Sequence, residues 1–258
     1  MTGDSSSFAA HATSFEVAAA SYERGRPPYP ADALDWLLPP GAQRVLDLGA
    51  GTGKLTRQLV SRGLDVVAVE PLASMRKQLT QVLPGIPALD GSAEHIPLPD
   101  ESVDAVLAAQ AWHWVTPERA APEVARVLRP GGTLGLVWNE RDEEVPWTAE
   151  LGQIVEEQGR KLEADLMRAQ NNSTEPRVGP PFGPLELRQV RWVHDTSVPE
   201  VIDMIASRSY VILLPQDQRE RLLADVRHLL ETDPALAGQA GVPLPYVTWC
   251  WRTRLTSP

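Results

Sequence analysis

The sequence predicts an α/β fold built on a doubly wound, mostly parallel sheet. Three observations predict it. Short apolar runs typical of strands alternate with helix-like segments up to about residue 140. The first run ends in Asp47, and glycines follow at alternate positions, Gly49, Gly51 and Gly53. A second run ends in another acid, Glu70, about 20 residues beyond the first glycine.

The elements of this first part follow in order. Five short apolar runs are expected to be strands, at residues 45–47, 65–70, 86–89, 103–107 and 133–138. Helices are expected at 54–62, 72–83 and 117–128. Thr116 and Pro117 are typical of a helix start, whereas Pro130 and the two glycines after it end the helix. Pro122 predicts a kink or a later start, because proline lacks the backbone donor.

A different pattern follows residue 140. We expect a charged amphipathic helix at 151–170, followed by a loop rich in Asn, Pro and Gly at 171–184. Two late strands are expected at 185–194 and 246–255, with two helices between them at 198–209 and 216–232. In the last strand Val247, Trp249 and Trp251 alternate with Thr248, Cys250 and Arg252, which predicts one apolar face. We expect four regions: an N-terminal flap (1–35), a core (36–140), a helical insertion with a loop (141–184), and C-terminal strands with a helical cover (185–258).

The glycine segment after the first strand is suited to hold a nucleoside-containing ligand on backbone atoms, because glycine has no Cβ to block the approach. A dinucleotide fingerprint is not met, since Lys54 stands where its last glycine belongs, and no phosphate-binding P-loop is present. Asp47 would repel a pyrophosphate but suits an ammonium or a hydroxyl. Glu70 stands where an acid can accept the hydroxyls of a ribose. A glycine turn without any ligand is the structural alternative.

These residues resemble the class I S-adenosylmethionine-dependent methyltransferases. The resemblance covers roughly residues 40–140 and rests on the joint order of the segments 47–53, Glu70, 91–94, 96–100, 103–107 and 128–132. It implies a Rossmann-like, seven-stranded, mostly parallel sheet, closed by a C-terminal antiparallel hairpin, with a helical cover inserted before and within it. A narrower resemblance, to small-molecule enzymes of the trans-aconitate methyltransferase-like group, rests on the segments 22–30, 110–114 and 207–210.

The resemblance implies S-adenosylmethionine as the cofactor, with the glycine loop at its amino-acid end, the acid after the second strand at its ribose, and the segment after the third strand at its adenine. The expected cofactor-binding residues are Tyr22, Arg26, Asp47, Gly49, Ala50, Gly51, Thr52, Gly53, Glu70, Pro71, Ser92, Ala93, Glu94 and Gln110. Many relatives have Asp where Ser92 stands. The adenine therefore gains only a neutral hydrogen bond here, or a partner from Glu94.

His113 is the candidate catalytic base, because it follows the fourth strand at the carboxyl edge of the sheet and its side chain titrates near neutral pH. The alternative is a histidine that simply hydrogen-bonds to the backbone. The expected substrate-binding residues are Tyr29, Trp112, Trp114, Arg208 and Tyr210. The two tryptophans would share a face if the strand continues, and core packing is their alternative. Arginines such as Arg26 and Arg208 could pair with a cofactor carboxylate or an acidic acceptor, or simply face solvent.

The composition indicates which kinds of protein and partner are expected. The chain has 258 residues, enough for a full core, and its formal net charge of −10 disfavours nucleic acid as a partner. Cys250 is the only cysteine, so no disulfide within the chain and no metal site are expected. The sequence has no run of about 18 apolar residues and no apolar signal core, which favours a cytoplasmic protein without a membrane partner. Monomer and homodimer stay open.

The function expected from these observations is methyl transfer from S-adenosylmethionine to a small molecule, at a carboxylate or hydroxyl oxygen. Other functions remain open at this point. One is a fold relative that binds the cofactor but catalyses a non-methylation reaction or acts as a regulator. A methyltransferase of RNA or protein is disfavoured by the acidic charge, and a nicotinamide oxidoreductase by the glycine spacing.

Overall fold

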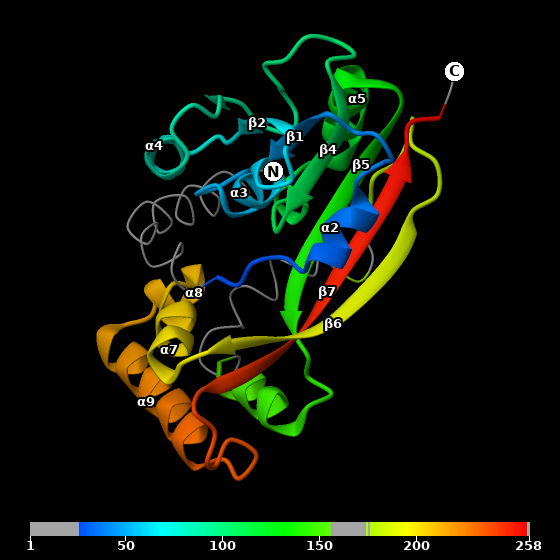
Figure 1. Ribbon diagram of the computed structural model, residues 1–258. Helices are drawn as coiled ribbons and strands as arrows, with labels where there is room; N and C mark the ends of the chain where they lie inside the picture. The colour runs from blue at the N-terminus through cyan, green and yellow to red at the C-terminus, as the bar shows by residue number, and fades with distance from the viewer. Residues whose placement is uncertain (1–25, 156–173, 175, 257–258) are drawn as a thin grey trace. The chain divides into compact units, whose positions relative to one another are not determined.

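The computed structural model describes residues 26–155, 174 and 176–256. It contains a seven-stranded sheet in the order β3-β2-β1-β4-β5-β7-β6 (Figure 1). The strands are β1 Arg44–Leu48, β2 Asp65–Val69, β3 Ala88–Leu89, β4 Val103–Ala109, β5 Leu128–Arg141, β6 Glu186–Thr196 and β7 Val242–Arg254. The pairs β1–β2, β1–β4, β2–β3 and β4–β5 are parallel, and β7 runs antiparallel to its neighbours. The predicted fold class is confirmed.

Helices alternate with these strands. They are α2 Ala31–Leu37, α3 Lys54–Val60, α4 Ala73–Val82, α5 Pro117–Val127, α7 Val198–Ala206, α8 Ser209–Ile212 and α9 Gln216–Thr232, with a short 3-10 helix η1 at Trp112–Trp114. Residues 146–155 are also helical, and the remainder of the charged helix expected at 151–170 lies outside the described residues. α5 continues through Pro122, and β5 begins directly after the end of that helix. α2 and α8 were not expected from the sequence.

The chain forms two compact units. One comprises Pro28–Glu140, Gln170–Val190 and Thr248–Pro258, and we refer to it as the α/β unit. The other comprises Met1–Pro27, Arg141–Ala169 and Arg191–Val247, and we refer to it as the helical unit. Each has its own apolar core among the described residues, that of the helical unit including Trp147, Leu222 and Leu244. The strands β5, β6 and β7 have residues in both units.

The central strands of the α/β unit are buried on both faces. Leu46 and Leu48 pack in one cluster with Val124 of α5, whereas Val45 packs in another with Leu34 of α2. Because neighbouring residues of a strand point to opposite faces, helices cover both sides of the sheet. This two-sided burial explains why the strands are continuous apolar runs and do not alternate with polar residues.

The last strand differs from its prediction in one respect. Trp249 and Trp251 pack against the cluster that contains Val124, as the expected apolar face. Cys250, from the opposite face, is fully buried in the cluster that contains Leu34, and burial raises the pKa of its thiol to about 12. The opposite face is therefore covered as well, but two of its three side chains are polar: Thr248 donates to Asn139 Oδ1 at 2.7 Å, and the guanidinium of Arg252 lies 4.3 Å from the ring centre of Trp36.

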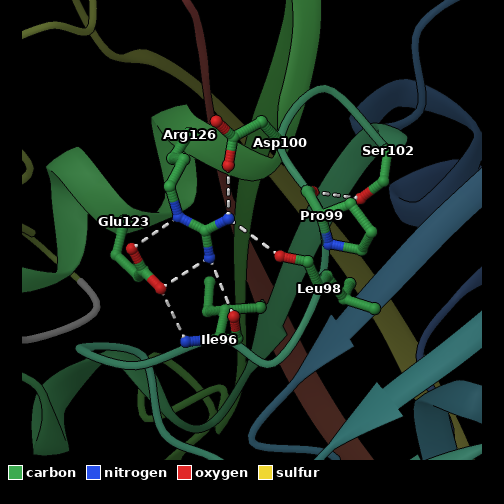
Figure 2. Close-up of polar contacts among 7 residues, drawn as sticks. All are labelled: Ile96, Leu98, Pro99, Asp100, Ser102, Glu123 and Arg126. Atoms are coloured by element: carbon green, nitrogen blue, oxygen red, sulfur yellow. Dashed lines mark hydrogen bonds and ion pairs between the residues drawn. The ribbon is translucent and has the colours of Figure 1, made fainter.

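Arg126, in the last turn of α5, holds the segment between β3 and β4 (Figure 2). Its guanidinium donates to both carboxylate oxygens of Glu123, to Asp100 Oδ1 at 2.7 Å, and to the backbone oxygens of Ile96 and Leu98, each at 2.8 Å. Glu123 Oε1 in turn accepts from the amide of Ile96 at 2.9 Å. The guanidinium lowers the pKa of Glu123, and the two carboxylates raise that of Arg126. One side chain therefore fixes the path of residues 96–100.

Replacing Arg126 by methionine should lower the free energy of unfolding by about 1–3 kcal/mol, because several hydrogen bonds to charged groups are lost together. Urea denaturation measures this change. Arg221→Met is the matched control, since its guanidinium makes an exposed pair with Asp217 on α9. That control should change stability by less than about 0.5 kcal/mol. Equal losses in the two variants would contradict the role given to Arg126.

Candidate functional site

The glycine loop after β1 forms a tight turn into α3. Gly49, Gly51 and Gly53 all have positive φ, at 72°, 57° and 92°, and Gly53 is the residue before the first helical position. Side chains with a Cβ rarely adopt this left-handed conformation, which explains the choice of glycine. The amides of Gly49 and Ala50 donate to the backbone oxygen of Val69, at 2.8 and 3.1 Å. The loop is thereby tied to the end of β2.

The three glycines differ in what surrounds them. A Cβ on Gly49 would lie 2.6 Å from the Cβ of Ala111, and one on Gly53 would lie 3.0 Å from Leu79 Cγ. A Cβ on Gly51 would meet nothing within 4 Å. Packing within the protein thus accounts for Gly49 and Gly53, whereas Gly51 borders open space. Thr52, next in the loop, is buried.

Glu70 connects this loop to the end of β2. Its side chain is 6% exposed, and its two carboxylate oxygens accept from the amides of Gly51 and Leu72, each at 2.9 Å. Arg76 donates to the backbone oxygens of Glu70 and Pro71 and pairs with Asp90 at 3.0 Å. Burial raises the pKa of Glu70, against the two amides and Arg76, which lower it. Arg76 thus joins the ends of β2 and β3, a role that the sequence did not indicate.

Asp47 lies beneath the loop and is fully buried. The hydroxyl of Thr56, in the first turn of α3, donates to Asp47 Oδ2 at 2.6 Å. Oδ1 is buried and has no hydrogen-bond partner among the residues that the structure describes. Burial raises the pKa of Asp47 to about 7, and the neighbouring charge of Glu70 adds to the rise. A carboxylate in this position gains most from a cation or a donor brought by a ligand.

The segment after β3 makes a tight turn. Ser92 and His95 exchange two backbone hydrogen bonds of 3.1 Å, and Ala93 between them is 6% exposed. A Cβ on Gly91 would lie 2.6 Å from Pro97 Cδ, so this turn is closely packed. The carboxylate of Glu94 accepts from the amide of Thr116, at the start of α5, at 2.9 Å. Glu94 therefore has a structural partner of its own.

The segment after β4 corrects one expectation. The strand ends at Ala109, Gln110 adopts a positive φ of 54°, and Trp112–Trp114 form a 3-10 turn. Trp112 and Trp114 therefore do not share the face of a continuing strand, because they lie in a 3-10 turn. The side chain of Gln110 donates to the backbone oxygen of Asn139 at 2.9 Å. Trp112 is fully buried, and its indole donates to the backbone oxygen of Arg177 at 2.8 Å, as in the core-packing alternative.

His113 accepts a hydrogen bond at Nδ1 from the indole of Trp138, with 3.3 Å between the two nitrogens. The rings of His113 and Trp114 are 4.8 Å apart and tilted by 48°. Trp138 is 4% exposed, so it fixes the orientation of the imidazole. Since a neutral imidazole carries one proton, a proton on Trp138 directed at Nδ1 places the ring proton on Nε2.

The other predicted residues are spread over both units. Tyr29 is buried in the α/β unit, where its backbone exchanges two hydrogen bonds with the side chain of Gln58. Arg26 and Arg208 belong to the helical unit. Tyr22 and the side chain of Tyr210 lie outside the described residues. The structure brings together Asp47, the glycine loop and Glu70, and it adds Thr56 and Arg76, which sequence reasoning missed.

Comparisons with known proteins agree with this geometry. Residues 46–136 match the model of a methyltransferase domain. An uncharacterized methyltransferase of Mycobacterium tuberculosis is 55% identical over 242 residues, which cover 94% of this chain and 96% of that protein. A methyltransferase structure from Anaeromyxobacter dehalogenans has a TM-score of 0.61 at 28% identity, covering 89% and 96% of the two chains. The chain belongs to the S-adenosylmethionine-dependent methyltransferases.

One structure of this fold contains the cofactor. It is phosphoethanolamine N-methyltransferase 2 of Haemonchus contortus in complex with S-adenosyl-L-methionine, with a TM-score of 0.52 at 15% identity, covering 94% of this chain and 57% of that one. The glycine loop of our methyltransferase fits such a cofactor. Gly51 leaves the space that a ligand on the backbone needs, and the buried Asp47 oxygen suits its ammonium group.

In the described part of the chain, no helix has the length and apolar character needed to cross a bilayer. No group of three or more His, Cys, Asp or Glu side chains there is arranged to hold a metal ion.

Gly51→Ala tests whether the open space beside the loop is the cofactor site. Its added Cβ meets no protein atom, so the expected loss of stability is the cost of a left-handed alanine, about 1–2 kcal/mol. Affinity for S-adenosylhomocysteine should fall more than about tenfold, as measured by calorimetry. Gly63→Ala is the matched control, since Gly63 has a φ of 77° and open space around it but lies between α3 and β2. Normal affinity in Gly51→Ala would contradict the assignment.

Asp47→Asn tests the buried carboxylate. Because the folded protein holds this proton up to about pH 7 and the unfolded chain releases it near pH 4, Asp47 makes the folded state less stable as pH rises between these values. The asparagine should remove that part of the decline, so denaturant unfolding without cofactor should show a smaller fall in stability from about pH 5 to about pH 8. Affinity for S-adenosylhomocysteine should weaken more than about tenfold, or 1.4 kcal/mol. Identical pH profiles would contradict the burial argument.

Proposed function

We propose that this methyltransferase transfers the methyl group of S-adenosylmethionine to an oxygen of a small molecule, a carboxylate or a hydroxyl, with the carboxylate favoured. The observation that carries the proposal is the hydrogen bond from the indole of Trp138 to Nδ1 of His113. His113 is the side chain that the sequence predicts as the catalytic base. Whether the reaction needs a base depends on the acceptor, because a carboxylate needs none whereas an amine or an alcohol does.

The cofactor supplies a methyl group on a sulfonium, whose sulfur leaves as the new bond forms. The residues proposed to bind it are those of the glycine loop, with Asp47 for the ammonium group, Glu70 for the ribose hydroxyls, and Ser92 and Ala93 for the adenine. The carboxylate of Glu70 accepts one amide at each oxygen, and each oxygen can accept a second donor. Glu70 can therefore hold the loop and a ribose together.

A carboxylate acceptor is ionised at neutral pH and attacks without losing a proton, whereas an amine, an alcohol or a carbon acid needs a base. In His113 the nitrogen that could take up a proton is Nδ1, and Trp138 donates to it. Nε2 carries the proton and is a donor. An imidazole in this state is suited to orient an anionic oxygen and poorly suited to deprotonate a neutral one, which favours a carboxylate.

A small acceptor is supported by charge. The chain has 34 acidic and 24 basic side chains, whereas proteins that bind nucleic acid depend on clustered lysine and arginine to neutralise phosphates. The acidic surplus would also repel an acidic protein substrate. Alignment of a small acceptor with the sulfonium methyl can itself lower the barrier by several kcal/mol.

Incubation with S-adenosylmethionine and a panel of carboxylic acids, phenols and amines tests the proposal, with products identified by mass spectrometry. Methyl esters are expected, and methyl ethers would assign the hydroxyl. Methylation of amines, or of RNA or protein in place of small molecules, would overturn the proposal.

His113→Gln separates the two roles of the imidazole. A glutamine side chain can still accept from Trp138 and donate to an acceptor, so turnover of a carboxylic acid should fall by less than about tenfold. The pH profile of kcat should show no ionisation near pH 6–7 in either protein. Trp138→Phe removes the indole donor and serves as the comparison. A loss of more than about a hundredfold in His113→Gln, with a lost ionisation in the profile, would identify His113 as a base.

A further inference from the structure

Two side-chain amides hold the backbone of Pro28 and Tyr29 from opposite sides. Gln58, on α3, accepts from the amide of Tyr29 at 2.9 Å and donates to the backbone oxygen of the same residue at 2.7 Å. Asn139, on β5, donates to the backbone oxygen of Pro28 at 2.9 Å. All four residues belong to the α/β unit. Two consecutive residues are therefore fixed between a helix and a strand that lie far apart in the sequence.

The carboxamide of Asn139 is oriented by its partners. The backbone oxygen of Pro28 can only accept, so it requires the amide nitrogen, and Oδ1 accepts from the hydroxyl of Thr248, on β7, at 2.7 Å. The backbone oxygen of Asn139 accepts from the side chain of Gln110 at 2.9 Å. One residue thus joins the chain before α2 to the end of β4 and to β7.

Gln110 connects Asn139 to the glycine loop. It follows β4 and adopts a positive φ of 54°, which is uncommon for residues other than glycine. Its amide donates to the backbone oxygen of Val137 at 2.9 Å, and its side chain bonds to Asn139, so β5 holds this turn at two points. Ala111 comes next, and its Cβ would lie only 2.6 Å from a Cβ on Gly49. The turn held by β5 therefore packs directly against the glycine loop.

Gln58 connects the same segment to the other end of the glycine loop. α3 begins directly after Gly53, and Gln58 lies one turn into it. Tyr29 is 8% exposed and packs in one cluster with Leu55, from the first turn of α3, and Val137, from β5. Apolar packing and hydrogen bonds therefore hold Tyr29 in the same place.

These contacts form a closed ring. It runs from the glycine loop through Gln58 to the Pro28–Tyr29 segment, and it returns through Asn139 and Gln110 to the same loop. The loop follows β1 and the turn follows β4, and β4 is the parallel neighbour of both β1 and β5. The ring therefore lies along the carboxyl edge of three adjacent strands, where open α/β sheets bind their ligands.

We infer that Gln58 and Asn139 are positioning residues, which hold the Pro28–Tyr29 backbone as a wall of the cofactor site. Neither side chain needs to contact the cofactor. They keep this segment at a fixed distance from the glycine loop, so that binding does not have to order it. The inference rests on the proposed function, in which the glycine loop binds S-adenosylmethionine.

Asn139→Asp and Gln58→Glu test this wall. Each replaces an amide nitrogen by a carboxylate oxygen, which repels the backbone oxygen that it faces, while the original acceptor oxygen stays. The affinity for S-adenosylhomocysteine, measured by calorimetry, should fall more than about fivefold in both variants. Hydrogen exchange of the Tyr29 amide should be faster in both cofactor-free variants, because the segment is released. An affinity within about twofold of the wild type, or an unchanged exchange rate, in both variants would overturn the inference.

The double variant shows whether the two side chains act through one segment. If they do, releasing either side releases the wall. The double variant should then lose about as much affinity as the weaker-binding single variant. Losses that multiply would mean that the two side chains act separately, and would overturn the shared wall.

Asp104→Asn is the matched control for stability. Asp104 also holds backbone of the α/β unit, since its Oδ2 accepts from the amides of Gln43 and Arg44 at 2.9 and 2.8 Å, but it does so at the amino end of β1. This variant should lower the free energy of unfolding in urea and leave the affinity for S-adenosylhomocysteine within about twofold of the wild type. A loss as large as in the two test variants would overturn the inference.

These measurements need no methyl acceptor. If the variants behave as expected and no oxygen is methylated, the proposed oxygen acceptor fails and the wall stands. If oxygen methylation occurs and both variants bind S-adenosylhomocysteine as the wild type does, the wall fails and the proposed function stands.

Discussion

The carboxylate of Glu70 holds the glycine loop to the end of β2 by accepting from the amides of Gly51 and Leu72. Much of the candidate site depends on this interaction. It brings a second buried acid close to Asp47, whose pKa rises to about 7 mainly because of burial and in part because of Glu70. Two carboxylates in a space of low polarity are costly to ionise together. A cofactor bound as proposed would bring a positive charge and hydroxyl donors to the same place and would reduce that cost.

The site is held by contacts between the connections of the sheet. Arg76 joins the ends of β2 and β3, and Arg126 fixes residues 96–100 against α5. Both are arginines that donate mainly to backbone oxygens or to acids far away in the sequence. Because loops carry few apolar contacts, such polar anchors hold these two connections in place.

The parts of the fold set by local patterns could be predicted from the sequence. The glycine loop, the acids at the ends of two strands, and α9 at Gln216–Thr232 all follow from short-range composition. The extent of β5 could not be predicted in this way. It runs from Leu128 to Arg141, and its pairing with β4 shifts register between Leu128 and Thr133, so Pro130 and the two glycines lie in an irregular stretch that no local pattern predicts as strand. The turn at Gln110 could not be predicted either, because a positive φ at a residue other than glycine has no local sequence signal.

In the candidate site, too, the residues marked by a local pattern could be predicted and the contacts between distant residues could not. Asp47 and Glu70 could be identified from their position after apolar runs, but the partners that define their chemistry could not. Thr56 reaches Asp47 only because α3 packs over the strand, and Trp138 reaches His113 from the neighbouring strand β5.

The central claim is that the buried Asp47 ionises when a cationic cofactor binds beside it. Calorimetric titration with S-adenosylhomocysteine at about pH 6, in two buffers with different enthalpies of ionisation, measures the protons exchanged on binding. The account predicts tight binding with net release of a proton, a release that disappears above about pH 8 because the carboxylate is then already ionised. Binding without any proton release at pH 6 would contradict it.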